Sequence, residues 1–292
     1  MEISSFMPEL PEVQTVVNHL AKKIVGKVFC NARVLVKKMV SSGFQSQIKN
    51  KKIISVSRRG KMLVLALSEN LFLLGHLKMT GQLIFVDKQG RVAGGGHPIE
   101  SADFNLAQPN KFTRIILSFT DGSRLLFHDL RKFGWMKIVD QNQYSTIDRQ
   151  FGIDPLSQAF TLKIFHDILF KRPKPKIKQL LMMQELIAGI GNIYADESLF
   201  GGKILPTRPA ASLRESEIKK LHQSIIRNLK VAIRYGGTSV NTFISPSGRR
   251  GRFAEKLRVY GRAGDPCFVC HHTLKRIKLA GRGTVYCPYC QK

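Results

Sequence analysis

The spacing of apolar side chains divides the chain into three regions, and the first is a helix near the N-terminus. Residues 11–24 place apolar side chains three or four positions apart, which predicts a helix with one buried face. Pro11 suits the first turn of such a helix, and Gly26 suits its end. The leader before it, residues 1–6, shows no helical or strand period.

The second region, from about residue 28 to residue 139, has the pattern of an all-β domain. Short runs of β-branched and apolar residues alternate with turn residues, and no helical period separates them, which predicts an antiparallel sandwich or barrel. Residues 87–110 carry three consecutive glycines and few large apolar side chains, so we expect a flexible surface loop there. The expected strands lie at 53–57, 62–67, 71–74, 82–86, 115–119, 124–127 and 136–139.

The helical period returns in the third region, after about residue 150. Ser212 and Glu215 have the spacing of a capping box at the start of the longest helix. Residues 238–254 are polar and contain glycine, which predicts a loop. The expected helices lie at 162–169, 177–186, 193–200 and 212–235.

These patterns predict an α+β protein with three parts. We expect an N-terminal helix and antiparallel β-sandwich over 1–140, of which 1–6 is a spurious or removed leader. A helical domain should follow over 150–254, including the loop 238–254, and a small C-terminal module over 255–292. A chain of 292 residues is long enough for such an organisation.

The charge of the chain indicates a polyanionic partner. It has 47 Lys and Arg against 20 Asp and Glu, a formal net charge of +27, within an otherwise globular composition of 43% hydrophobic residues. Nucleic acid and an anionic membrane surface are the two partners that fit. No stretch approaches the roughly 20 apolar residues that span a bilayer, and no signal peptide pattern opens the chain.

Four of the five cysteines form two close pairs near the C-terminus, Cys267-x-x-Cys270 and Cys287-x-x-Cys290. The 16 residues between the pairs fit a zinc ribbon, in which four thiolates surround one tetrahedral ion. A site closed by four cysteines has no open coordination position, so we expect one structural Zn²⁺. Free thiolates as ligands fit a reducing, cytoplasmic setting.

The segment Met7-Pro8-Glu9-Leu10-Pro11-Glu12 has two interpretations. It is a suitable start for a helix, with acidic residues in the first turn. If the chain began at Pro8, its ring nitrogen would instead be a secondary amine with a pKa of about 8, able to attack a sugar C1′ and form a cationic Schiff base. Glu9 and Glu12 lie beside that amine in the sequence.

Several separate motifs resemble the bacterial formamidopyrimidine-DNA glycosylase family, also called 8-oxoguanine-DNA glycosylases. The resemblance runs from Met7 to Lys292. It implies a bifunctional DNA glycosylase and AP lyase of base excision repair, which removes oxidised purines and cuts the abasic strand by β,δ-elimination. The matching segments are MPELPEV (7–13), RRGK (58–61), GHLKMTG (75–81), LRKFG (130–134), GIGNIYADESLF (189–200) and VYGRAGDPC (259–267).

The resemblance also implies which residues act in catalysis. Pro8 would be the nucleophile that becomes the imine, and Glu9 the general acid and base. Lys61 occupies the position of the catalytic lysine of the family, although in isolation it is only a basic residue at the start of a strand. Arg282, between the two cysteine pairs, matches an arginine that grips phosphate near the lesion and assists δ-elimination.

A second group of residues would bind DNA. Met79, Arg131 and Phe133 match the side chains that fill the void left by a flipped-out nucleotide, although Met79 and Phe133 also suit ordinary core packing. The loop 238–254 corresponds to the loop that covers the lesion. The remaining expected contacts are Lys174, Lys178 and Asn192, toward phosphates, and Glu12 beside the nucleophile.

The partner that the resemblance implies is double-stranded DNA that carries oxidised bases or abasic sites. The resemblance also implies a monomer that acts in the bacterial cytoplasm and does not bind a membrane. The sequence departs from the family pattern at Phe112, where a DNA-contacting His is usual, and in the length of the loop 87–110.

The leader 1–6 is the most consequential departure, because it places the nitrogen of Pro8 in a peptide bond. We therefore expect the active form to start at Pro8. If the leader persisted, a catalytically silent lesion-binding protein would be the alternative. A second alternative, an endonuclease-VIII-like enzyme for oxidised pyrimidines, is disfavoured by Leu10, since that branch typically has glycine there.

Overall fold

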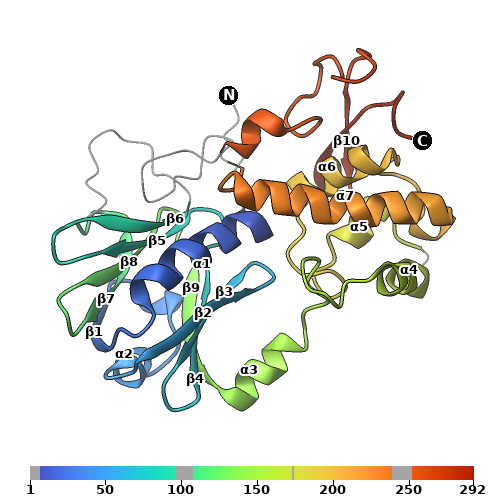
Figure 1. The fold of residues 1–292 in the computed structure, drawn as a ribbon. Coiled ribbons are helices and arrows are strands. Elements are labelled where there is room, and N and C mark those ends of the chain that lie inside the picture. Colours follow the sequence, from blue (N-terminus) through green and yellow to red (C-terminus); the bar gives the residue numbers. More distant parts are fainter. Residues whose placement is uncertain (1–6, 97–107, 173, 239–251) are drawn as a thin grey trace. The chain divides into compact units, whose positions relative to one another are not determined.

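The computed structural model describes residues 7–96, 108–172, 174–238 and 252–292. The chain folds as two units, one formed by Met1–Arg149 with Tyr235–Arg252 and the other by Gln150–Arg234 with Phe253–Lys292. The leader 1–6 and most of the loop 238–254 lie outside the described residues. The expected α+β class is confirmed, with antiparallel sheets in the first unit and helices with a small hairpin in the second (Figure 1).

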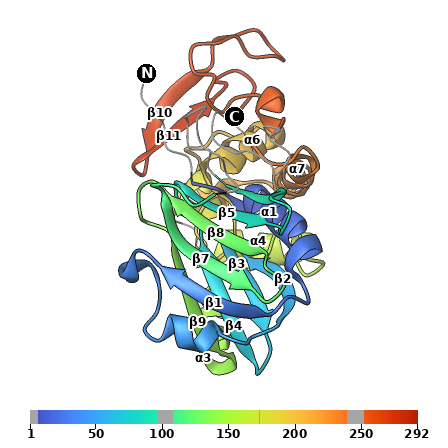
Figure 2. The same cartoon turned by 90° about the vertical axis from the view of Figure 1, so that its left-hand side faces the viewer.

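Two antiparallel sheets form the first unit. The five-stranded sheet has the order β1-β7-β8-β5-β6 and the four-stranded sheet the order β2-β3-β4-β9 (Figure 2). All seven expected strands are present, and six of them are one or two residues longer than their apolar runs. The bounds are β1 Phe29–Val34, β2 Ile53–Arg59, β3 Met62–Leu67, β4 Leu71–His76, β5 Gly81–Val86, β6 Val92–Gly96, β7 Thr113–Phe119, β8 Arg124–Asp129 and β9 Trp135–Asp140.

Strands β1 and β6 were not expected, and β6 corrects part of the predicted loop 87–110. Residues Val92–Gly96 pair with β5 through the register Gln82↔Gly96 to Val86↔Val92. Three glycines have no side chains that could show a strand period, so the pairing depends on the neighbouring strand rather than on a local pattern. Residues 97–107, inside the same expected loop, lie outside the described residues.

Helix α1 (Leu10–Ile24) closes the open side of the sandwich. It packs against β6 and β2, the edge strands of the two sheets (Figure 1). Its buried face, which includes Val13, Val16 and Leu20, belongs to the same hydrophobic core as both sheets. The start of α1 is therefore held rigidly at the rim of the sandwich. Two short helices, α2 (Phe44–Ile48) and α3 (Gln141–Asp148), complete this unit.

The chain passes between the two sheets at two neighbouring turns. Residues 77–80 lead from β4 to β5, and residues 130–134 lead from β8 back to β9. The pairs His76↔Trp135 and Gly81↔Asp129 flank these turns on the two sheets. Because both ends of the turns are paired, the two turns must lie side by side at one corner of the sandwich.

Among its described residues, the second unit contains four α-helices, two short 3-10 turns and a β-hairpin. The capping box expected from Ser212 and Glu215 is wrong: Ser212 lies in a 3-10 turn, and its hydroxyl donates to the carbonyl of Pro209. Glu217 instead accepts from the backbone N–H of Arg214 at 2.8 Å. The helix expected over 177–186 ends early. The bounds are α4 Leu162–Lys171, α5 Ile177–Leu181, α6 Asn192–Gly202, α7 Glu215–Arg234, β10 Lys275–Leu279 and β11 Arg282–Tyr286.

Candidate functional site

Pro8 and two glutamates, Glu9 and Glu12, lie close together in the sequence at the start of α1, and all three are buried. Glu9 and Glu12 are each 4% exposed, and Pro8 is buried. Pro11 supports the first helical turn, and the backbone N–H of Glu9 donates to Oε2 of Glu12 at 3.0 Å. The positive end of the helix dipole favours anionic side chains at this place. The segment can therefore hold a proton-transferring carboxylate directly after Pro8.

The carboxylate of Glu12 accepts hydrogen bonds from two backbone N–H groups. The N–H of Thr238 donates to its Oε1 at 2.7 Å, while its Oε2 receives the N–H of Glu9. Gly237 has φ +86°, and a Cβ there would lie 3.1 Å from Oε1 of Glu12. Both carboxylate oxygens of Glu12 therefore accept backbone N–H groups, and the expectation that Glu12 takes part in DNA binding stays a prediction. Glu12 joins the start of α1 to residues 237–238, where the loop 238–254 begins.

Lys61 lies in the turn between β2 and β3 and is only 8% exposed. It stands near His76, whose pKa is lowered to about 3, first by burial and then by the positive charges of Lys78 and Lys61. The N–H of Lys78 donates to Nδ1 of His76 at 2.9 Å, so the neutral imidazole carries its proton on Nε2. Sequence analysis left His76 without a role, although it lies within the segment GHLKMTG.

The three residues expected to fill a DNA void come together on the two turns that cross between the sheets. Nη1 of Arg131 lies 3.2 Å from Sδ of Met79, and the guanidinium carbon lies 4.8 Å from the centroid of the Phe133 ring. Phe133 is 51% exposed, so it does not pack in the core. An exposed cluster of an aromatic ring, a thioether and a guanidinium can enter a base stack.

Arg114, close to the unusual Phe112, binds backbone carbonyls near the end of β8. Its Nε donates to the carbonyl of Asp129 at 2.8 Å, and its Nη1 donates to the carbonyl of Lys111 at 2.9 Å. Phe112 accepts the N–H of Asp129 through its carbonyl at 2.9 Å. Both residues therefore support the end of β8.

Lys174 and Lys178 differ sharply in exposure. Lys174 is exposed in the segment between α4 and α5. Lys178 is 1% exposed, and its Nζ lies 2.7 Å from Oδ1 of the fully buried Asp196. Burial raises the pKa of Asp196 to about 6, although the charge of Lys178 acts in the opposite direction. The expectation that Lys178 contacts a phosphate is corrected, because its ammonium is part of the interior.

Asn192 is anchored to the backbone of Gly283, the residue that follows Arg282. Nδ2 of Asn192, at the start of α6, donates to the carbonyl of Gly283 at 3.0 Å, and Nζ of Lys178 donates to the same oxygen at 3.2 Å. Arg282 directly precedes Gly283 and is exposed. An exposed guanidinium next to an anchored amide can grip a phosphate.

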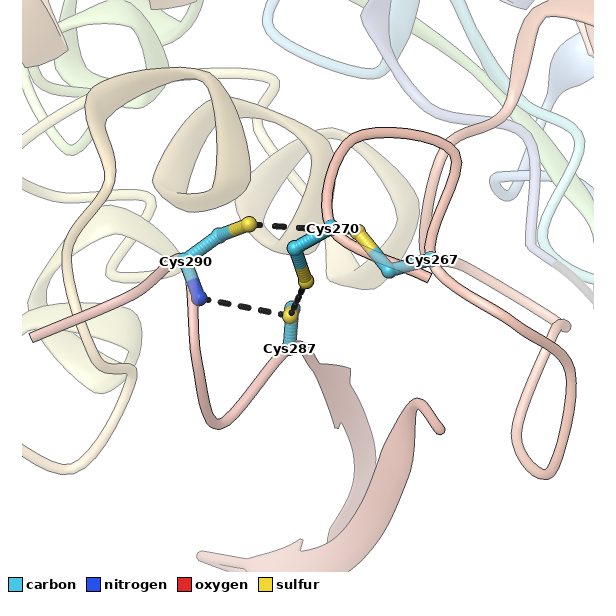
Figure 3. Close-up of side chains that lie close together, drawn as sticks. All are labelled: Cys267, Cys270, Cys287 and Cys290. Carbon is cyan, nitrogen blue, oxygen red and sulfur yellow. Dashed lines mark hydrogen bonds between the residues drawn. The ribbon is translucent and has the colours of Figure 1, made fainter. Parts of the chain in front are cut away.

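The four cysteines expected to bind zinc lie in one cluster (Figure 3). Their sulfur atoms are all within 4.8 Å of one another, with 3.4 Å between Cys270 and Cys287 and 3.9 Å between Cys267 and Cys290. Four sulfurs at zinc-ligand distance in a tetrahedron are separated by about 3.8 Å. The donor set and its spacing therefore fit one tetrahedral Zn²⁺.

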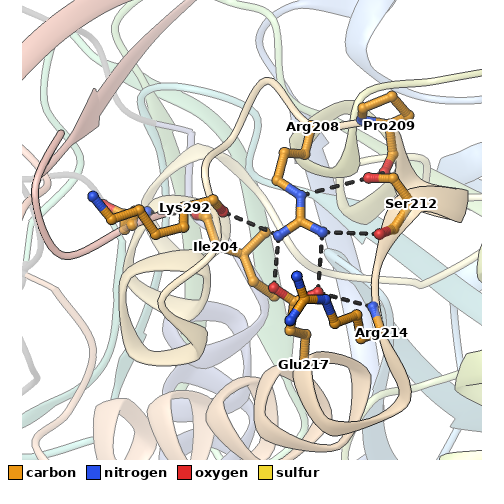
Figure 4. Close-up of polar contacts among 8 residues, drawn as sticks. Ile204, Arg208, Pro209, Ser212, Arg214, Glu217 and Lys292 are labelled. Atoms are coloured by element: carbon orange, nitrogen blue, oxygen red, sulfur yellow. Dashed lines mark hydrogen bonds and ion pairs between the residues drawn. The ribbon is translucent and has the colours of Figure 1, made fainter.

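Arg208 anchors the module that carries these cysteines (Figure 4). Its guanidinium pairs with both carboxylate oxygens of Glu217, at 2.6 and 3.0 Å, and donates to the carbonyls of Ser212 and Lys292. A bidentate pair of this kind is directional as well as charged. It fixes the last residue of the module to the start of α7.

Among the residues that the structure describes, no helix is both long and apolar enough to cross a membrane.

Comparisons with known proteins agree over nearly the whole chain. Residues 7–136 match the formamidopyrimidine-DNA glycosylase N-terminal domain, residues 151–244 the H2TH domain of the same glycosylases, and residues 264–292 a zinc finger found in these enzymes and in IleRS. The formamidopyrimidine-DNA glycosylase of Lactococcus lactis is 39% identical over 291 residues, which cover 98% of this chain and 100% of that protein.

Solved structures give the same result. A complex of a mutant Lactococcus lactis enzyme with DNA containing Fapy-dG superposes with a TM-score of 0.84 at 36% identity, covering 98% of this chain and 100% of that one. A second complex of the Lactococcus lactis enzyme, with DNA containing an abasic site, has a TM-score of 0.82 at 34% identity and covers 97% of this chain and 99% of that one.

Proposed function

The chain belongs to the formamidopyrimidine-DNA glycosylase family and is a DNA glycosylase of base excision repair, and from this we propose which residues perform its reaction. Its substrate is double-stranded DNA with an oxidised purine, and AP lyase activity is typical of the family. The observation that carries the proposal is a buried Pro8 followed by two buried carboxylates at the start of α1.

Pro8 acts as the nucleophile through its ring nitrogen. The nitrogen forms a bond to C1′ while the glycosidic bond breaks, and the base leaves with that electron pair and takes up a proton. Opening of the sugar ring gives a cationic imine at C1′, which acidifies the C2′ hydrogen. Loss of that proton breaks the 3′ C–O bond, and a second elimination, after loss of the C4′ proton, breaks the 5′ C–O bond.

Glu9 moves the protons that this sequence requires, because it is the carboxylate next to the nucleophile and is largely withdrawn from water. The nitrogen of Pro8 can attack only if it is free, since a peptide nitrogen has its lone pair delocalised into the carbonyl. The proposed active form therefore has Pro8 as its first residue, with Met7 removed as well as residues 1–6.

Lys61 assists the processing of the damaged base and the β-elimination. Cationic and neutral donors on each unit bind the phosphates. In the first unit this is the Nε2–H of His76, and in the second unit these are Lys174, Asn192 and Arg282. Arg282 also assists δ-elimination. Met79, Arg131 and Phe133 occupy the space that the extruded nucleotide vacates, and the cost of extrusion, a few kcal/mol, is offset by these contacts. We propose that the protein acts in the bacterial cytoplasm and associates with the nucleoid when it is bound to DNA.

Borohydride trapping on a duplex with an abasic site tests the proposal. The protein that starts at Pro8 should form a covalent adduct, and peptide mass analysis should locate it on Pro8. The matched control retains residues 1–6 and should form none. An adduct of the control, or one located on Lys61, would overturn the assignment of Pro8. A protein that starts at Pro8 and binds lesion DNA but traps nothing would favour the silent lesion-binding alternative.

A further inference from the structure

We propose that Asp129 is a positioning residue for filling the DNA void: its buried carboxylate sets the two turns that carry Met79, Arg131 and Phe133. The inference rests on the proposed function, in which those three side chains enter the base stack. Asp129 is 0% exposed and therefore acts only through the residues it binds. It ends β8, directly before the turn 130–134.

Both oxygens of the carboxylate are used, and their donors come from both turns. Oδ1 accepts the N–H of Arg131 at 3.1 Å and the hydroxyl of Thr80. Oδ2 accepts the N–H of Gly134 at 2.7 Å. The hydroxyl oxygen of Thr80 in turn accepts the N–H of Arg131 at 2.9 Å, so the turns are joined by a closed set of bonds.

Each donor is at most one residue away from a void-filling side chain. Thr80 follows Met79, Gly134 follows Phe133, and the third donor belongs to Arg131 itself. Hydrogen bonds to an ionised acceptor are stronger and more directional than neutral ones. Because all three side chains are set from one charged group, a small change at Asp129 displaces them together.

The carboxylate is itself held in place by the sheet. The N–H of Asp129 donates to the carbonyl of Phe112 at 2.9 Å, and its carbonyl accepts Nε of Arg114 at 2.8 Å. A Cβ on Gly134 would lie 2.5 Å from the ring of Phe127 and 3.1 Å from Oδ2, so the backbone of the second turn packs directly on the carboxylate. Asp129 thus transmits the position of β8 to both turns.

The test is Asp129→Asn, which keeps the shape of the side chain but turns one acceptor into a donor that faces an N–H or a hydroxyl. Asp121→Asn is the matched control. Asp121 caps the turn at the opposite end of β8, where its Oδ1 accepts the N–H of Ser123 at 3.0 Å. Thr80→Val removes only the linking hydroxyl, and Thr80→Ser retains it. Thr80→Val carries the same test if Asp129→Asn fails to fold.

Two duplexes separate void filling from general folding. In the first, an abasic site lies opposite cytosine; in the second, it lies opposite a gap, so that no orphaned base remains for Arg131. Single-turnover strand cleavage by Asp129→Asn should fall at least about tenfold on the first duplex, the factor for one charge-assisted hydrogen bond. On the second duplex the fall should be clearly smaller, because the contact of Arg131 with an orphaned base is absent there for every variant. Thr80→Val should behave likewise, while Thr80→Ser and Asp121→Asn keep both rates.

A fluorescence measurement gives the same comparison without chemistry. 2-Aminopurine opposite a stable tetrahydrofuran abasic analogue should change its emission when the wild type enters the stack, and this change should be lost in Asp129→Asn. An equal fall in cleavage on both duplexes, or a wild-type emission change in a folded Asp129→Asn protein, would overturn the inference. All variants and the reference protein start at Pro8, and the proposed function fails separately, through the absence of a trapped adduct in that reference protein.

Discussion

Replacing Lys178 by Met should destabilise the protein without changing how its DNA affinity responds to salt. The ammonium lies 2.7 Å from a carboxylate oxygen of Asp196, and both side chains are almost fully buried. Removing one partner of a buried pair leaves the other charge without a counterion, which costs about 3–5 kcal/mol of unfolding free energy. Methionine has a similar length, so the cost arises from charge rather than from a cavity.

The loss should depend on pH, because Asp196 can take up a proton. Its pKa is already raised by burial to about 6 from the ordinary 3.8, and removal of Lys178 raises it further. A carboxyl with a raised folded-state pKa binds a proton on folding, so its contribution to stability falls by about 1.4 kcal/mol per pH unit as pH rises between the two values. The deficit of Lys178→Met should be small at about pH 5 and should grow above about pH 6.

Urea unfolding of the zinc-loaded protein, at about pH 5 and at a pH above about 6, measures the loss of unfolding free energy in Lys178→Met. Lys174→Met is the matched control, because Lys174 is exposed in the segment just before α5. Loss of one phosphate contact reduces the slope of log affinity against log salt by about 0.9. We expect that reduction for Lys174→Met and none for Lys178→Met. A Lys178→Met protein with wild-type stability and a reduced slope would refute the assignment of this lysine to the interior.

Three further predictions concern other parts of the molecule. In Glu12→Gln, the new amide N–H₂ group faces one of two backbone N–H donors, that of Glu9 or that of Thr238. Single-turnover base excision should therefore fall about tenfold, while the melting temperature of the first unit changes little. Unchanged excision would contradict this prediction. Chelation of zinc, or Cys287→Ser, should abolish DNA binding while the emission of Trp135, the only tryptophan, stays native, because the sandwich has its own core; simultaneous loss of both would show that the units unfold together. Burial lowers the pKa of His128 from 6.5 to about 4. The free energy of unfolding should therefore fall by up to about 3 kcal/mol as the pH drops from about 6.5 to about 4, because only the unfolded chain takes up the proton in this range. Urea titrations of His128→Gln should show a shallower fall, and a pH profile identical to that of the unsubstituted protein would contradict this prediction.

Features with a local cause could be predicted from the sequence. Seven strands followed from apolar runs, because a sandwich strand buries one face wherever it lies in the sheet. The zinc cluster followed from the spacing of Cys267, Cys270, Cys287 and Cys290, since two short knuckles suffice to build a tetrahedral site. The family itself was recognisable because its motifs are contiguous.

Local signals failed where a neighbour decided the outcome. Strand β6 has glycines in place of a side-chain period and exists through its pairing with β5. Ser212 and Glu215 have capping-box spacing, but Arg208 binds the carbonyl of Ser212 and pairs with Glu217, so the helix begins later. In both cases a contact with a nearby segment outweighed a local preference of less than about 2 kcal/mol.

Burial and proximity were decided only by the tertiary structure. The sequence does not distinguish Lys178 from Lys174, because both are lysines in the same short segment. In the structure the ammonium of Lys178 is buried beside Asp196, whereas Lys174 is exposed. Met79 and Phe133 are far apart in the chain, and both contact Arg131 because two turns cross between the sheets at the same corner, joined by Asp129. A sequence determines which side chains can bind a charge or enter a base stack. Which of them do so depends on the solvent each one retains after folding, and that is a property of the packed chain.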